Sequence, residues 1–361
     1  MANLTSPEIT IRFIESGATA ITRSERGTVA LVLKDSVTGS PFTVYTVSDI
    51  PVGLSDENKK FVREALAGYQ NAPKKVIVYL LDIDEDHTLA ARYTEMMKYF
   101  ETHEFDWMAI PTVQTDGKAA EVATWIKGLR DTYHLPRKAV LPNQAADSEG
   151  IVNVTSSLYD SDGTEITAEQ TTPRVAGLIA GTPMSISATY APLLDYADCT
   201  RLSKAEADAA VTAGKLVFVW DGEKVKLNRA VNSFVTTTST KGDSFKKIKI
   251  VEIMDLIQVD VRAAIEDGYI GKYPNTYDNK CLLITAVNAY FAELVRSGLL
   301  AAGTCEIDID AQRNYLVAQG VDVAEMSDQD IKEANTGSHV FLRAYISILD
   351  AMEDIALDIY I

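Results

Sequence analysis

The chain has 361 residues, of which 47% are hydrophobic, and its formal net charge at pH 7 is −17. This length allows two or three domains with their own hydrophobic cores. The acidic balance argues against nucleic-acid binding, which depends on Lys and Arg contacts to phosphate. No apolar run reaches the roughly 18 residues of a membrane-spanning helix, and the first ten residues lack the basic and apolar regions of a secretory signal. We therefore expect a protein that folds in a cytoplasm and does not bind membranes.

The N-terminal part is expected to be rich in β-strands. In the stretch EITIRFI, Ile9, Ile11 and Phe13 alternate with polar residues, which is the pattern of a half-buried strand. GTVALVLKD and, after a TGSP turn, FTVYTV at 42–47 are expected to be further strands. The apolar stripe of 55–69 predicts a helix that its first residue, a serine, can cap.

The middle of the chain alternates predicted strands and helices, which indicates a mainly parallel, doubly wound-like sheet of the α/β class. The strands are expected to be nearly continuous apolar runs because both faces of such a sheet are buried. They are predicted at 75–82, 106–113, 137–143 and 150–156. Helices are predicted around 89–100, 122–133, 172–181 and 203–214, and a hairpin with a DG turn at 215–231.

The last third predicts a C-terminal α+β domain. A long helix at 245–266 and a second helix after the YIGKYPN loop are followed by a short strand, CEIDID, and a polar stretch with one or two short helices. HVFLRAYISIL is predicted to be a strand. The final residues, DIALDIYI, alternate without a break and also predict a strand. The apolar side of that strand consists of Ile355, Leu357, Ile359 and Ile361.

Enzyme signatures are nearly absent from the sequence. There is no GxGxxG or P-loop motif, the four histidines are scattered, and Cys199, Cys281 and Cys305 include no CxxC pair. We therefore expect no catalytic residue, no cofactor and no metal, and we interpret the cysteines as buried thiols. The Gly-containing stretch GLIAGTPMS lacks the Lys of a phosphate-binding loop, and its small residues favour close helix packing.

One short motif leaves an alternative open. Asp82 and Asp84 follow a predicted strand and resemble the start of the motif of haloacid-dehalogenase phosphatases, in which an Asp attacks phosphorus beside a Mg²⁺ ion. That motif requires Thr or Val two residues after the second Asp, where this chain has Asp86. The competing interpretation is an acidic turn before the helix that starts near Thr88.

Four blocks of sequence resemble contractile tail sheath proteins, the subunits around the tube of phage tails and R-type bacteriocins, and most closely those of Gram-positive bacteria. The blocks are TTPRVAGLIAGTPMSISATYAPL, AGKLVFVWDGEKVKLNRAVNSFVT, the 245–300 region with its YIGKYPN loop, and ANTGSHVFLRAYISILDAMEDIALDIYI. The resemblance covers most of the chain and is clearest from Thr171 onward. It implies a linking arm at 1–20, a β-rich segment at 21–72, an α/β sheath domain at 73–230, an assembly domain at 231–349 and a second arm at 350–361.

The resemblance implies a structural function and no enzyme activity. Sheath subunits stack as six-fold rings around an inner tube in an extended, metastable state, and contraction drives the tube through a bacterial envelope. The expected partners are other copies of the chain, the tube protein, and baseplate and terminator proteins at the ends. Assembly is expected in the bacterial cytoplasm, in a virion tail or a tailocin.

The resemblance also assigns roles to residues. The arms, through Ile9, Ile11 and Phe13 and through the Ile355 to Ile361 face, would donate strands to neighbouring copies, and Ser16-Gly17 and 350–354 would be flexible joints. Both terminal strands could instead pair within their own subunit. The accepting sheet is expected to include Val340, Leu342, Ala344 and Ile346. Arg313, Asn314 and Gln319 are the candidate tube contacts, although this stretch could equally be a solvated helix face.

Overall fold

The computed structural model describes residues 21, 26–37, 39–82 and 88–361. By their internal contacts, these residues divide into two units. The α/β unit contains 26–260, with the gaps given above, together with 297–301 and 348–361. The C-terminal unit contains 21, 261–296 and 302–347. The predicted strand of Ile9, Ile11 and Phe13 and the predicted joint at Ser16-Gly17 lie outside the described residues.

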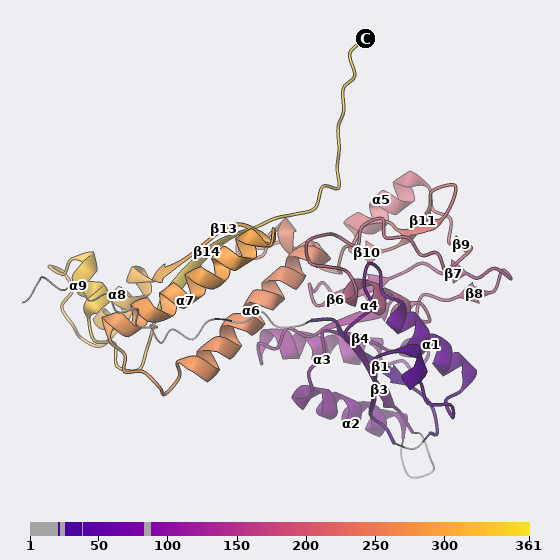
Figure 1. The fold of residues 1–361 in the computed structure, drawn as a ribbon, viewed down its shortest axis with the longest axis horizontal. Coiled ribbons are helices and arrows are strands. Elements are labelled where there is room, and N and C mark those ends of the chain that lie inside the picture. Colours follow the sequence, from indigo (N-terminus) through magenta and orange to yellow (C-terminus); the bar gives the residue numbers. More distant parts are fainter. Residues whose placement is uncertain (1–20, 22–25, 38, 83–87) are drawn as a thin grey trace, which may run out of the picture. The chain divides into compact units, whose positions relative to one another are not determined.

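A seven-stranded sheet forms the centre of the α/β unit, with the strand order β10-β6-β5-β4-β1-β3-β2 (Figure 1). All neighbouring strands are parallel except β2, which is antiparallel to β3. This confirms the predicted α/β class. Its strands are β1 (Thr28–Leu33), β2 (Phe42–Val44), β3 (Lys75–Leu80), β4 (Trp107–Ala109), β5 (Lys138–Pro142), β6 (Ile151–Val154) and β10 (Lys215–Leu216). Strands β1 and β2 come from the segment 21–72, so that segment shares one sheet with the residues that follow it.

Two apolar layers cover the two faces of this sheet. Successive side chains of a strand point to opposite faces, so β1 contributes Val29 and Leu31 to one layer and Ala30 and Val32 to the other. The first layer includes α1 (Asp56–Ala67) and α4 (Thr172–Ala180). The second includes α2 (Leu89–Thr102) and α3 (Ala119–Asp131). Burial on both faces explains why the strands read as continuous apolar runs.

Helices α1 and α4 pack closely because of the small residues in the stretch GLIAGTPMS. A Cβ atom added to Gly177 would lie 2.1 Å from the carbonyl oxygen of Ala65 in α1. The predicted packing role of these glycines is confirmed. The caps were also predictable: Ser55 Oγ accepts the backbone N–H of Asn58, and Ser203 forms a capping box with Glu206 at the start of α5 (Lys204–Thr212).

Smaller elements complete the α/β unit. They are the 3₁₀ turns η1 (Val47–Asp49) and η2 (Asp243–Lys246), the hairpin β11 (Phe218–Trp220) and β12 (Val225–Leu227), and the sheet β8-β7-β9 made of β7 (Leu158–Tyr159), β8 (Glu165–Ile166) and β9 (Asp198–Cys199). The predicted DG hairpin corresponds to β11 and β12. No described helix is long and apolar enough to cross a bilayer.

The C-terminal α+β region is built from long helices and a two-stranded sheet (Figure 1). Helix α6 (Ile248–Gly268) contributes residues to both units, and α7 (Tyr277–Arg296) buries the stripe that the sequence predicted. The other elements are β13 (Leu300–Ile307), α8 (Ile309–Ala318), α9 (Asp328–Glu333) and β14 (Leu342–Ile348).

Several predicted boundaries were wrong for local reasons. Strand β2 ends at Val44 because the carboxylate of Asp49 accepts the backbone N–H groups of Tyr45 and Thr46 and closes a turn there. Strand β4 ends at Ala109, two residues before Pro111, which cannot donate to a strand ladder. Strand β13 starts at Leu300, earlier than the predicted CEIDID strand, and Asp308 ends it by capping α8.

Candidate assembly site

Among the residues that the structure describes, the sheet of β13 and β14 has an open edge. The N–H of Asp308 donates to Phe341 O at 3.0 Å, and the N–H of Leu349 donates to Leu299 O at 2.9 Å, so the start of one strand meets the end of the other and the pair is antiparallel. No third strand of the described chain joins this sheet. An unpaired edge presents backbone N–H and C=O groups that another strand can use.

The outer edge of β13 is partly occupied by a side chain of α7. The amide of Asn288 accepts the N–H of Cys305 at 2.7 Å and donates to Cys305 O at 3.1 Å. This amide therefore satisfies the backbone groups that a strand would need in the middle of β13. A strand added to this sheet is accordingly favoured at the outer edge of β14.

The predicted accepting residues lie on or beside β14. Leu342, Ala344 and Ile346 alternate along the strand, while Val340 precedes it. Ile346 is 39% exposed and Val340 is 43% exposed, although both are large aliphatic side chains. The apolar side of β14 is therefore incompletely covered by the described part of the chain.

The predicted C-terminal arm contains no helix or strand after Ile348 (Figure 1). Its apolar side is almost fully exposed: Ile355 is 81%, Leu357 78% and Ile359 77% accessible, and Ile361 is exposed as well. Such a regular row of exposed aliphatic side chains is unusual for a folded protein and marks an interaction segment. Within the described residues, no strand pairs with it.

The beginning of this arm is held by ion pairs of the α/β unit. Arg229 Nε lies 3.1 Å from Glu353 Oε2, and a second guanidinium nitrogen of Arg229 pairs with Asp354. Thr189 Oγ1 donates to Glu353 Oε1 at 2.6 Å. Lys247 pairs with Asp350. Burial opposes ionisation of Asp350, but the hydrogen bonds from Lys247 and from the backbone N–H of Ala351, together with the charges of Lys247 and Lys249, outweigh burial and lower the pKa of Asp350. The expected joint at 350–354 is thus anchored, and we call residues 350–354 the arm root.

A similar anchor holds the described chain where it emerges from residues 22–25. Arg26 pairs with Asp106 at 2.7 Å, and Asp106 Oδ2 accepts the backbone N–H groups of Gly27 at 2.8 Å and Thr28 at 2.9 Å. The segment before β1 is therefore fixed to the start of β4. Asp106 was assigned to a strand in the sequence, but nothing there indicated this role.

A buried charge cluster joins three elements of the α/β unit and was missed by sequence reasoning. Lys138 of β5 is fully buried, and its Nζ lies 2.6 Å from Asp255 and 2.9 Å from Glu252 of α6. Arg130 of α3 donates two hydrogen bonds of 3.0 Å to Asp255. Burial disfavours the Asp255 carboxylate, but Lys138 and Arg130 outweigh it and lower its pKa. The cluster fixes the first half of α6 to the sheet.

The candidate tube contacts lie on and just after α8. Arg313 is half-buried and pairs with Asp328 at 3.1 Å, while Asn314 and Gln319 are exposed. The ion pair reduces the net charge that Arg313 offers to a partner. The structure therefore leaves the tube contact a prediction.

The phosphatase motif gains no support. Asp82 is exposed and its backbone carbonyl accepts a hydrogen bond from Arg92, whereas Asp84 lies outside the described residues. Thr88 caps α2 by accepting the N–H of Ala91 at 3.3 Å. No cluster of three or more potential metal ligands occurs in the described ranges. Cys199 and Cys305 are buried, and Cys281 is half-buried.

Comparison with protein families explains this combination of a closed α/β unit and an open sheet. The model of the phage tail sheath protein central domain matches residues 87–233, and that of the phage tail sheath C-terminal domain matches residues 240–361. The chain belongs to the phage tail sheath family. Its two matched regions cover most of the chain, and none of these matches supports the phosphatase alternative.

Individual proteins with similar sequences support the same family assignment. The tail sheath protein of Clostridium phage phiCD119 is 39% identical over 353 residues, which are 96% of this chain and 97% of the relative. Protein XkdK of the phage-like element PBSX of Bacillus subtilis is 31% identical over 64% of this chain and 54% of its own length. The chain is therefore a tail sheath protein, as the sequence blocks indicated.

Solved structures share the fold. The sheath tail protein of Desulfitobacterium hafniense matches with a TM-score of 0.70 and 20% identity, over 83% of this chain and 94% of the other. The helical sheath of the anti-feeding prophage in its contracted state also matches with a TM-score of 0.70, at 13% identity over 99% of both chains. The fold of this chain is the one found in contractile sheaths.

Proposed function

We propose that this chain polymerises into stacked six-fold rings around an inner tube, held extended until contraction drives the tube through a bacterial envelope. The supporting observation is the pairing of two incomplete features in one chain: an open β14 edge and an exposed alternating arm. Each would complete the other in a neighbouring copy, where the arm gains ladder partners and its aliphatic side chains are buried.

The contact between donor arm and acceptor sheet is heterologous, because the two surfaces differ. Such a contact propagates from copy to copy instead of closing into a dimer, as a helical array requires. The N-terminal arm, with Ile9, Ile11 and Phe13, is proposed to donate a second strand. Tube protein, baseplate and terminator proteins are the proposed partners at the inner surface and at the two ends, and assembly in the bacterial cytoplasm is proposed with them.

Anchored arm roots suit a polymer that changes shape. During contraction the bodies of neighbouring copies must move relative to one another while the copies remain linked. An arm fixed to its own copy at Arg229 and inserted in another copy at its distal part supplies such a tether. The energy is stored at assembly, so the proposal needs no nucleotide or metal.

Deletion of Asp354 to Ile361 tests the proposal. We expect a folded monomer with an unchanged melting temperature that forms no tubes in negative-stain electron microscopy. The matched control replaces Ala356 and Tyr360, on the opposite side of the arm, with serine and should still form tubes. An unfolded deletion variant, or one that polymerises normally, would contradict the exchange.

The proposed tube contact has its own test. Arg313→Glu should shorten sheaths assembled on tubes several-fold, because it reverses the charge at the proposed tube contact. Arg296→Glu, at the end of α7, serves as the control for a general charge effect. Full-length sheaths in normal yield from Arg313→Glu would exclude Arg313 from the tube interface.

A further inference from the structure

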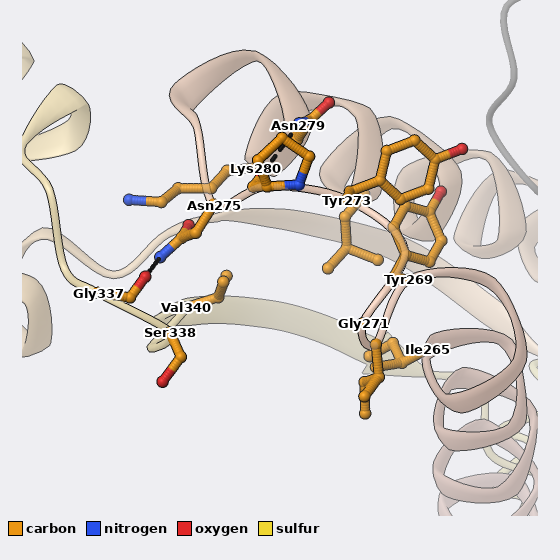
Figure 2. A pocket seen from close by; sticks show the side chains of 13 residues that line it. Ile265, Tyr269, Gly271, Tyr273, Asn275, Asn279, Lys280, Gly337, Ser338 and Val340 are labelled. Carbon is orange, nitrogen blue, oxygen red and sulfur yellow. Dashed lines mark hydrogen bonds between the residues drawn. The ribbon is translucent and has the colours of Figure 1, made fainter.

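An apolar cavity of about 630 Å³ lies in the C-terminal unit where α6 turns into α7 (Figure 2). Ile265 lines it from α6, Tyr269 from the turn just after α6, Leu283 from α7, and Val340 from the segment that leads into β14. Its volume is in the range of sites that enclose small ligands or several side chains. Of the residues that line this cavity, only Val340 was assigned a role from the sequence, as part of the accepting sheet.

Two polar atoms of the cavity residues are buried without a hydrogen-bond partner. They are the Oδ1 of Asn275 and the hydroxyl of Tyr269. The orientation of the Asn275 amide is fixed, because its Nδ2 donates to Gly337 O at 2.8 Å (Figure 2). The same nitrogen lies within hydrogen-bond distance of Thr336 Oγ1 at 3.1 Å and of His339 O at 3.0 Å. Buried acceptors normally have a donor. Because both atoms have almost no accessible surface, they belong to the wall of the cavity and are not contacts for a docked segment.

The cavity is continuous with the open edge of β14. Ser338 and Val340 line it, and β14 begins two residues after Val340, at Leu342. An extended segment that pairs with the outer edge of β14 and continues past Leu342 therefore arrives at the cavity. This continuity favours a strand as the occupant over a compact ligand.

The attachment of the arm root limits which residues of an arm can reach the cavity of another copy. Glu353 and Asp354 are bound to Arg229 of their own copy, whereas the residues beyond them are highly exposed. The tethered part of the arm cannot enter a cavity of another copy, but the distal part can. Strand β14 has seven residues, and Ile361 lies seven positions after Asp354. With the root opposite the end of β14, the distal residues reach its beginning.

We infer that this cavity receives Ile359 and Ile361 of a second copy, whose arm runs antiparallel to β14. The inference rests on the strand exchange proposed above and adds its direction and its terminal pocket. The distal side chains fill the apolar space between Leu283 and Val340. The cavity thereby selects antiparallel pairing, because a parallel arm would bring its tethered, acidic root to the apolar space.

Disulfide trapping between two differently tagged versions of the full chain tests this inference. One carries Val340→Cys and the other Ile361→Cys, and both carry Cys281→Ser to remove the half-buried thiol on α7. After co-assembly and mild oxidation, we expect a mixed covalent dimer on non-reducing gels. Its yield should be at least tenfold higher than with Ile355→Cys as the arm partner. Ser338→Cys replaces Val340→Cys if the latter prevents polymerisation.

The outcomes separate the inference from the proposed function. Trapping with Ile355→Cys instead of Ile361→Cys would show a parallel arm, and trapping with Ile11→Cys would show the N-terminal arm in the cavity; both overturn the inference while strand exchange stands. Tubes that form without any trapping also overturn it. Failure of the unmodified chain to form tubes overturns the proposed function and the inference with it.

Discussion

The central sheet of the α/β unit and the β13–β14 sheet differ in how far the described chain covers them. In the α/β unit, helices cover both faces of the central sheet, and even its internal charges find partners. In the β13–β14 sheet, no strand of the described residues pairs with the edge of β14, and Ile346 and Val340 are substantially exposed. The first region is complete in one copy, and under the strand exchange proposed above the second would be completed by another copy. Stability of the subunit and stability of the polymer should therefore respond to different mutations.

The largest effect is expected at the buried charge cluster. Lys138→Met leaves Asp255 and Glu252 buried with one fewer cation and should cost about 3–5 kcal/mol of unfolding free energy. Denaturant unfolding of the monomer measures it. Lys59→Met, which removes an exposed pair with Asp56, is the control and should cost at most about 1 kcal/mol. Equal losses of unfolding free energy in the two variants would show that the buried cluster stabilises the subunit no more than an exposed ion pair does.

A pH-dependent effect of intermediate size is expected at Glu64 in α1. Burial raises the pKa of Glu64 from 4.5 to about 7, although the hydroxyl of Tyr196 donates to its carboxylate. A raised folded pKa contributes stability that is complete below pH 4.5 and is lost as the pH rises through about 7. The loss should amount to roughly 3 kcal/mol.

The matched variant for this prediction is Glu64→Gln, which should flatten the stability profile between these pH values relative to the unmodified monomer. Glu57→Gln, on the exposed side of the same helix, should leave the profile unchanged. If the unmodified chain and Glu64→Gln show parallel profiles, Glu64 is not buried as described. Assembly of the polymer should not follow this titration, because Glu64 lies in the complete region.

The smallest effect on the subunit, and a clear one on the polymer, is expected at the arm root. Arg229→Gln removes half-exposed ion pairs to Glu353 and Asp354 and should change unfolding free energy by no more than about 1 kcal/mol. Sheath length in electron micrographs should nevertheless fall several-fold, because the arm loses its fixed starting point. Lys204→Gln, which breaks an exposed pair with Asp208, is the control. Sheaths of normal length from Arg229→Gln would refute the role of the root.

Sequence reasoning succeeded where one pattern determines one local structure. The buried runs predicted β1, β3, β5 and β6, serine caps located α1 and α5, and the small residues of GLIAGTPMS predicted close helix packing. These features depend on neighbours along the chain, which the sequence displays directly.

The features that were missed depend on residues far apart in the chain. Lys138 and Asp255 are 117 positions apart, and Arg229 and Glu353 are 124 apart. A lone lysine at the start of an apolar strand and acidic residues near the end of the chain carry no local signal of such pairing. The joint at 350–354 was therefore expected to be flexible, and the cavity beside Val340 was not foreseen.

The hydrogen bonds between the Asn288 amide and the backbone of Cys305 limit the number of strands that one copy can accept. With the middle of β13 occupied, the sheet retains one free edge among the described strands, so under the proposed strand exchange each copy would offer one acceptor to C-terminal arms. A row of copies linked in this way has direction: one end exposes an unused arm and the other an unfilled sheet. The two ends of such a row are chemically different, and each calls for a different capping protein.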